Sequence, residues 1–198
     1  MGRSKVTRLY SDTAYAKGKE SDSQALDAAA YLDISIKPVG LGRRSRFRQE
    51  DWARNRYLWT RIGYDHVFKR EGGTPSPSED RAIVSLWAKV PLPAEVWLEG
   101  RARVDFRWID GEYSTRYRLR VEATREFALL GHPVTPYFNV EWFYDTRYDG
   151  WARILYQAGP EVTVSKHFRF EVYLARQEDH LPKESALNAF GVVAKLYF

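Results

Sequence analysis

The stretch GRARVDFRWIDGEYSTRYRLRVE, residues 100–122, decides the fold, because charged and apolar side chains alternate along it with a period of two. Such alternation is typical of β-strands, whose successive side chains point to opposite faces of a sheet. At its centre, Asp110 and Gly111 form a dipeptide that favours a two-residue type I′ hairpin turn. This turn sets the register, and we expect Trp108 to face Tyr113 across the hairpin.

The two faces of this hairpin differ sharply in chemistry. The apolar face holds Ala102, Val104, Phe106, Trp108, Tyr113, Thr115, Tyr117 and Leu119. The ionic face holds Glu99, Arg101, Arg103, Asp105, Arg107, Arg116, Arg118, Arg120 and Glu122. A soluble sheet would turn the ionic face to solvent. However, the polar faces of this chain also carry the bulky rings Trp87, Tyr137 and Phe143, which favours a crowded polar interior.

The same division recurs in later segments, and the apolar faces stay nearly free of charge over about nine to twelve residues, the length that a tilted strand needs to cross a membrane. Aromatic residues near the segment ends are expected to form interfacial girdles; they are Trp59, Trp97, Trp108, Tyr113, Tyr148 and Trp151. An Arg or Lys on the lipid face costs about 2–4 kcal/mol at mid-bilayer, so the ionic face must point inward. The sequence therefore predicts an all-β fold, an antiparallel up-and-down transmembrane β-barrel with a charged lumen.

The strands are expected at about 56–69, 81–90, 96–109, 112–127, 135–145, 151–164, 168–177 and 186–198. Weaker alternation marks 4–15 and 29–39, whereas 40–54 is expected to be a loop or short helix and 71–80 a turn. Bacterial barrels have an even number of strands, so about ten are favoured, with eight as the alternative. We expect one domain, in which residues 1–54 form an N-terminal segment and residues 55–198 the main barrel.

Composition excludes several classes of function. The chain has 198 residues and a net charge of +5, with Lys and Arg closely balanced by Asp and Glu, so we do not expect nucleic acid as a partner. It has no cysteine and only four histidines without metal-ligand spacing, so no metal or cofactor is expected. The first twenty or so residues lack the apolar core of a signal peptide. Either the protein stays in the cytoplasm, or its true beginning, with an export signal, lies outside this sequence.

Residues from about 55 to 198 resemble the uncharacterised barrel family catalogued as domain of unknown function 2490. The matching positions are Arg101, Arg103 and Arg107; Arg116, Arg118 and Arg120; Asn139, Glu141 and Phe143; Arg153 with Gly159 nearby; and Glu171. The resemblance implies a barrel of the Gram-negative outer membrane and brings no established activity or ligand. The final stretch, NAFGVVAKLYF, also looks like the C-terminal strand of such barrels, with its terminal aromatic at Phe198. Such a strand is read by the barrel-assembly machinery, which we expect as a partner together with outer-membrane lipid.

Several roles remain open for the charged interior. Like-charged neighbours such as Arg103 and Arg118 need neutralising partners, and the nearest inward acids are Glu141 and Asp145. One interpretation is a self-satisfied network that stiffens the barrel; the other is a site that binds or transports a small anion. The candidate lumen residues are Arg101, Arg103, Asp105, Arg107, Arg116, Arg118, Arg120, Glu122, Asn139, Glu141, Arg153 and Glu171.

Enzymatic activity is the less favoured alternative. Some outer-membrane barrels hydrolyse lipids with Ser and His near the lipid-facing rim, and His66 is expected to face lipid near an outer strand end without a Ser two residues away. His132 and His167 are expected in periplasmic turns and His180 in an outer loop. No catalytic residue is assigned. A soluble lipocalin-like barrel is the alternative fold, and it would require the opposite polarity, with the apolar face inside.

Overall fold

The structure, a computed structural model, describes residues 7–17, 24–36, 58–71, 74–165 and 167–196. The strands within this part of the chain are β1 (Thr7–Lys17), β2 (Gln24–Ser35), β3 (Leu58–Glu71), β4 (Thr74–Pro91), β5 (Val96–Ile109), β6 (Glu112–Arg125), β7 (Phe127–Leu129), β8 (His132–Asp145), β9 (Gly150–Thr163), β10 (Phe168–Asp179) and β11 (Ser185–Leu196). A short 3₁₀ helix, Pro93–Glu95, joins β4 to β5. None of the described helical residues forms a segment long and apolar enough to cross a membrane.

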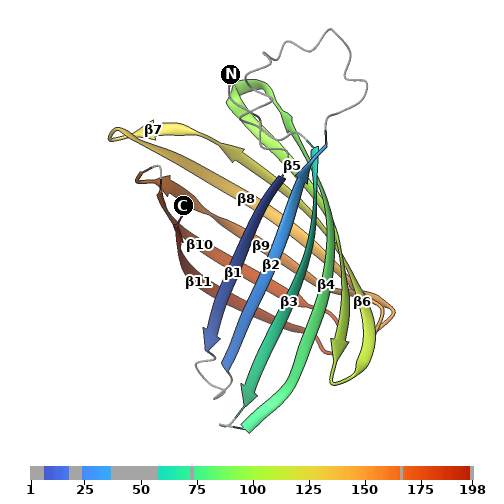
Figure 1. The fold of residues 1–198 in the computed structure, drawn as a ribbon. Coiled ribbons are helices and arrows are strands. Elements are labelled where there is room, and N and C mark those ends of the chain that lie inside the picture. Colours follow the sequence, from blue (N-terminus) through green and yellow to red (C-terminus); the bar gives the residue numbers. More distant parts are fainter. Residues whose placement is uncertain (1–6, 18–23, 37–57, 72–73, 166, 197–198) are drawn as a thin grey trace. The chain divides into compact units, whose positions relative to one another are not determined.

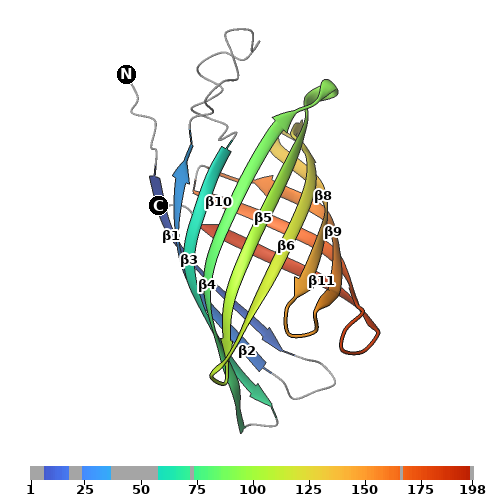
Figure 2. The same cartoon turned by 90° about the vertical axis from the view of Figure 1, so that its right-hand side faces the viewer.

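The described strands form one eleven-stranded antiparallel sheet, in which nearly every strand pairs with its neighbours in the sequence (Figure 1). Only the short β7 lies off this path, pairing with the start of β8. Figure 2 shows β8, β9, β10 and β11 running side by side, as their pairing requires. The up-and-down order and the ten-strand prediction are confirmed, because β1 and β2 join the sheet where only weak alternation had indicated strands. The segment 40–54 and Phe198 lie outside the described residues.

Contacts between residues divide the chain into two units. The first unit comprises residues 1–87 and 102–117, and the second unit comprises residues 88–101 and 118–198. Strands β4, β5 and β6 each contribute one part to either unit. The two units are described separately below.

The hairpin of β5 and β6 closes as its sequence predicts. Asp110 has φ 53° and Gly111 has φ 81°, and a positive φ at both central residues defines the type I′ turn. The rings of Trp108 and Tyr113 lie 5.5 Å apart, centroid to centroid, so these two residues face each other as expected.

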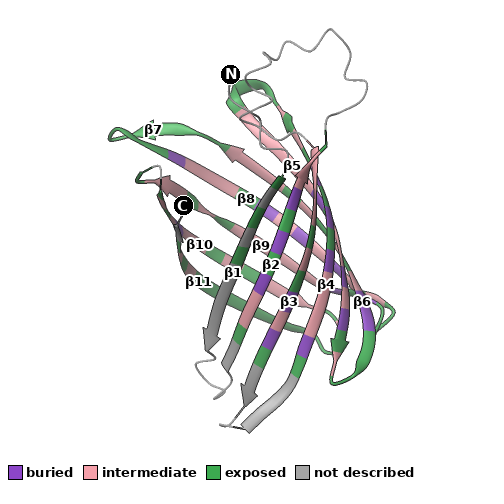
Figure 3. Ribbon diagram, in the orientation of Figure 1, coloured by how far each residue is buried: buried purple, intermediate pink, exposed green. Residues whose placement is uncertain are grey.

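The ionic face is the buried face of the strands, and the apolar face is exposed (Figure 3). Buried charged or amide residues in the first unit are Asp33, Asp65, Glu79, Asp105 and Arg107, and those in the second unit are Arg101, Asn139, Glu141, Asp145 and Glu171. Meanwhile Ile62 and Tyr117 of the first unit, and Leu119 and Phe138 of the second, are each about half exposed. Side-chain direction therefore follows the prediction, and it is the reverse of a soluble barrel.

Tyrosine and glycine residues pair across neighbouring strands on the buried face. Tyr31 is the register partner of Gly63, Tyr137 of Gly159 and Tyr173 of Gly191. The Tyr173 ring lies over Gly191 so closely that an added Cβ would fall 2.1 Å from its Cζ. The rings of Tyr31 and Tyr173 occupy space that Gly63 and Gly191 leave empty, which fixes the register of adjacent strands.

Two sequence-based expectations about local structure are wrong. Most of the segment 71–80 is strand and not turn, because β3 extends to Glu71 and β4 begins at Thr74, while residues 72–73 lie outside the described part of the chain. Pro75 and Pro77 are compatible with a strand since they are two residues apart, so their missing N–H groups affect only one neighbouring strand. In addition, Trp59 and Trp97 do not belong to the exposed girdle.

Both tryptophans lie on the face that carries the buried charges. Trp59 stacks on the buried Trp87 at 5.3 Å, and Trp97 lies under the Lys89 ammonium at 5.1 Å. Both residues lie close enough to the strand ends for an aromatic girdle. However, the alternation of side chains along β3 and β5 places them on the buried face and not on the exposed face. Trp108, Tyr113, Tyr148 and Trp151 are exposed, as a girdle requires.

Replacing Gly159 by Ala is expected to destabilise the second unit by about 1–3 kcal/mol, because overpacking forces the backbone apart. An added Cβ would lie 2.0 Å from the backbone oxygen of Val172, which cannot rotate away. Urea unfolding of the detergent-refolded protein, followed by tryptophan fluorescence, measures the effect. Gly100→Ala is the matched control, since nothing lies within 4 Å of its added Cβ. Equal midpoints for the two variants would contradict the close approach of β9 and β10.

Candidate functional site

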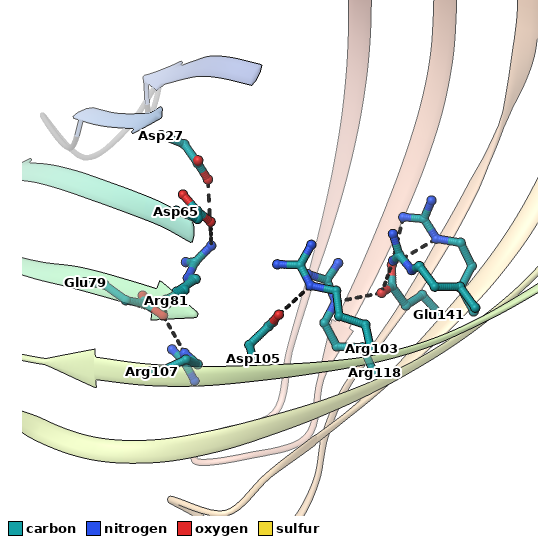
Figure 4. Close-up of polar contacts among 11 residues, drawn as sticks. Asp27, Asp65, Glu79, Arg81, Arg103, Asp105, Arg107, Arg118 and Glu141 are labelled. Carbon is teal, nitrogen blue, oxygen red and sulfur yellow. Dashed lines mark hydrogen bonds and ion pairs between the residues drawn. The ribbon is translucent and has the colours of Figure 1, made fainter. Parts of the chain in front are cut away.

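Three arginines of the second unit converge on one buried carboxylate, an arrangement called here the Glu141 cluster (Arg101, Arg118, Arg120 and Glu141). The Arg118 Nε donates to Glu141 Oε1 at 2.7 Å, and the Arg120 Nη2 donates to Oε2 at 2.8 Å. Arg101 donates to the same Oε1. Glu141 is completely buried, and Figure 4 shows the guanidinium groups directed at its carboxylate.

Strand alternation brings these four side chains together. Arg118 and Arg120 are two residues apart on β6, so they share one face, and Arg101 and Glu141 reach the same place from β5 and β8. The Arg118 guanidinium also lies 4.7 Å from the centre of the Phe143 ring. The aromatic neighbour helps a partly desolvated cation, since a ring face attracts positive charge.

The Glu141 cluster contains three positive groups and one negative group. Further acids lie nearby on the same strands, and Glu122 accepts a hydrogen bond from the Asn139 side chain at 3.2 Å. A buried carboxylate that receives hydrogen bonds from three cations is held in place on both oxygens. Glu141 therefore offsets part of the repulsion among the three like-charged arginines.

The first unit has a corresponding arrangement around another buried acid, called here the Glu79 cluster (Asp27, Asp65, Glu79, Arg81 and Arg107). Glu79 Oε1 accepts from Arg81 Nε at 2.8 Å and from Arg107. Arg81 also donates to Asp65 at 3.0 Å and lies 3.7 Å from Asp27 (Figure 4). Here acids outnumber bases, in contrast to the Glu141 cluster.

The first unit also contains a paired contact that holds Arg61 in place. Its Nε and Nη2 donate to the two oxygens of the buried Asp33, at 2.7 and 3.2 Å. Its guanidinium lies 5.0 Å from the Tyr31 ring centre and 5.3 Å from that of Trp87. The two-point geometry and the aromatic contacts are those that arginine makes when it is held rigidly.

The structure brings most of the predicted lumen residues into charge-assisted contacts. Arg101, Arg118 and Arg120 bind Glu141; Arg103 binds Asp105; Arg107 binds Glu79; Glu122 accepts from Asn139; Arg153 binds Asp179 at 2.6 Å; and Glu171 accepts from Tyr137 at 2.5 Å. Arg116 is half-buried on β6. Asp145, the other inward acid expected near the arginines, accepts the backbone N–H of Arg147 in the turn that follows β8.

Sequence reasoning missed the acidic half of the first unit's network. Glu79 and Arg81 alternate with the apolar positions of β4, but the proline-rich stretch before them hid the strand. Asp27 and Asp33 are six residues apart on β2 and so share a face, a signal that was present in the sequence.

His66 has an acidic partner on the exposed face of the first unit. Its Nδ1 lies 2.6 Å from Asp80 Oδ1, which also accepts from the Tyr64 hydroxyl. A histidine held by an acid is one part of a hydrolytic site. Among the described residues, however, no hydrogen bond joins His66 to a serine.

The fold and the buried ionic face define an antiparallel β-barrel. The crystal structure of the beta domain of the Bordetella autotransporter Brka has the same fold, with a TM-score of 0.60 and 15% sequence identity. The similarity covers 98% of this chain and 85% of that one. At this identity the likeness establishes the architecture and no more.

The family follows from the sequence itself. The model of the family described as Protein of unknown function (DUF2490) matches residues 49–188, and the chain belongs to this family. The resemblance of the arginine-rich strands is thereby confirmed. No match to a curated protein was found.

Replacing Glu141 by Gln is expected to destabilise the protein by about 3–5 kcal/mol, because it leaves three arginines without their shared counter-charge in a buried site. Urea unfolding in detergent measures the loss. The matched control is Glu161→Gln, which disrupts the 2.9 Å pair with Arg169, a residue that is 44% exposed. Exposed pairs contribute about 0–1 kcal/mol. A Glu141→Gln variant as stable as this control would show that the Glu141 cluster is not important for the fold.

Proposed function

We propose that the protein is an outer-membrane β-barrel whose interior is filled and stiffened by ion pairs. The observation that carries this proposal is the reversed polarity of the strands, with charge on the buried face and hydrocarbon on the exposed face. In water such exposure of Leu, Phe and Tyr would favour aggregation. Within a bilayer the same surface is favourable, because lipid tails cover it.

The contacts of the buried face support a structural role. The two clusters and the Arg61 and Arg103 pairs give buried acids basic partners within each unit. Networks of this kind hold side chains in one arrangement, since breaking any single pair strands a buried charge. The barrel neighbour Brka, an autotransporter domain, is consistent with a place in the outer membrane.

The proposal includes two partners. Outer-membrane lipid covers the exposed apolar face, and the barrel-assembly machinery reads the C-terminal strand that ends in Phe198. Both follow from the barrel class rather than from a contact in the structure.

Leu119→Arg tests the membrane location. Leu119 is 48% exposed near the middle of β6, so a charge there is expected to cost about 2–4 kcal/mol in a bilayer and to block insertion. Folding into lipid vesicles is measured by the shift in gel mobility between unheated and heated samples. Leu130→Arg is the control, because Leu130 is 93% exposed in the turn after β7 and outside the strands. Efficient insertion of the Leu119→Arg variant would refute the membrane orientation.

A second candidate function is binding or passage of a small anion. The Glu141 cluster favours it, because its three guanidinium groups exceed the single carboxylate between them. A phosphate or carboxylate solute is the class of ligand that several arginine forks recognise. Enzymatic activity on lipid has weaker support, since the His66–Asp80 pair lacks a partner nucleophile among its contacts.

Conductance in planar bilayers separates the structural role from the anion pathway. A barrel filled by ion pairs is expected to give no steady current, because its arginines stay engaged with acids. An anion pathway would instead give anion-selective current, reduced when Arg103 and Arg118 are both replaced by Gln. If the wild type gives an anion-selective current and the double variant does not, the structural role is refuted and the transport role is supported.

A further inference from the structure

The exposed face of the second unit carries a hollow of about 340 Å³ over strands β8 to β11. Its floor is Ala158, whose register partners are Phe138 on β8 and Leu174 on β10. A methyl group between two large side chains leaves a depression, and Phe138 and Leu174 form its walls. These two residues are 51% and 66% exposed, so the hollow opens on the face that the proposed function turns toward lipid.

The lining of the hollow is almost wholly apolar, but two polar residues, Arg176 and Asn188, border it. Arg176, which also lines it, is the register partner of Tyr156 on β9 and of Asn188 on β11. Its Nε donates to Glu178 at 2.8 Å, and its side chain is 55% exposed. Within the described residues the terminal nitrogens of Arg176 and the Asn188 amide make no hydrogen bond. They are therefore available to a ligand at that border.

The position along the strand agrees with a membrane boundary. Arg176 lies three residues before the end of β10 at Asp179, whereas Leu174 and Phe138 lie deeper along their strands. A charge on the lipid face is least costly near the interface, where headgroups and water reach it. The apolar side chains of Leu174 and Phe138 match the acyl chains of a lipid molecule, and the Arg176 cation nearer the strand end matches its headgroup.

We propose that this hollow binds one anionic phospholipid, with an acyl chain against Ala158 and the phosphate on Arg176 and Asn188. The inference rests on the proposed membrane location. The volume lies in the range of about 300–1,000 Å³ typical of ligand sites. Guanidinium recognises phosphate with paired N–H donors, and Glu178 orients the group through Nε while leaving the terminal nitrogens free for that contact.

Native mass spectrometry of the folded protein in detergent tests this binding with phosphatidylglycerol as the probe. The wild type is expected to retain one phosphatidylglycerol more strongly than diacylglycerol, which lacks the phosphate. Arg176→Gln is expected to weaken retention roughly tenfold, the effect of losing one charge-assisted contact. Ala158→Phe fills the floor and is expected to weaken it through the acyl chain. Inorganic phosphate alone is expected not to compete.

Arg169→Gln is the matched control, because Arg169 lies on the same strand, is 44% exposed and pairs with Glu161 at 2.9 Å without lining the hollow. Unchanged phosphatidylglycerol binding by both Arg176→Gln and Ala158→Phe overturns the site, as does equal retention of diacylglycerol by the wild type. The heat-dependent gel shift shows which samples are folded. A wild type that enters vesicles but shows no lipid preference overturns this inference alone, whereas one that never enters vesicles overturns the proposed function as well.

Discussion

Neutralisation of buried charge is the constraint on which the rest of this structure depends. Glu141 has no exposed surface and receives three guanidinium groups, and Glu79 receives two. These charged groups could not move to the opposite face of the sheet without a cost in free energy, because that face is made of Leu, Phe and Tyr. A strand that slipped by one residue would exchange the two faces and expose every charge on the apolar side. The ion pairs therefore select the register as well as occupy space.

Close packing between strands reinforces that selection. The Tyr31–Gly63 and Tyr173–Gly191 pairs place a ring over a residue without a side chain, and at Gly159 the backbone of β10 itself comes close enough to exclude a Cβ. A slip by two residues would preserve the faces but would set a ring against a side chain. The buried charges thus disfavour a shift of the strand register by an odd number of residues, and the glycines disfavour a shift by an even number. Together they leave a single strand pairing.

The sequence contained enough information to predict the sheet but only part of its network. Period-two alternation and the Asp110-Gly111 turn predict the hairpin and the direction of its side chains, because both signals are local. The convergence of three arginines on Glu141 depends on which strands become neighbours and on side-chain conformations, neither of which is local. Glu79 was missed because the prolines and glycines two to seven residues before it resemble a turn. Trp59 was misassigned because distance from a strand end was given more weight than alternation.

The exposed face is not uniformly apolar, because it also carries a few polar groups. Tyr64 and His66 both bond to Asp80, and Arg176 bonds to Glu178, so these polar groups are paired within the exposed face. The nearest residues to His66 on the same face of β3 are Tyr64 and Phe68, a phenol already bound to Asp80 and a hydrocarbon ring 4.1 Å from the imidazole. Asp80 thus fixes the imidazole as one member of a closed polar group. The polar groups of Tyr64, His66 and Asp80 therefore satisfy one another on the exposed face.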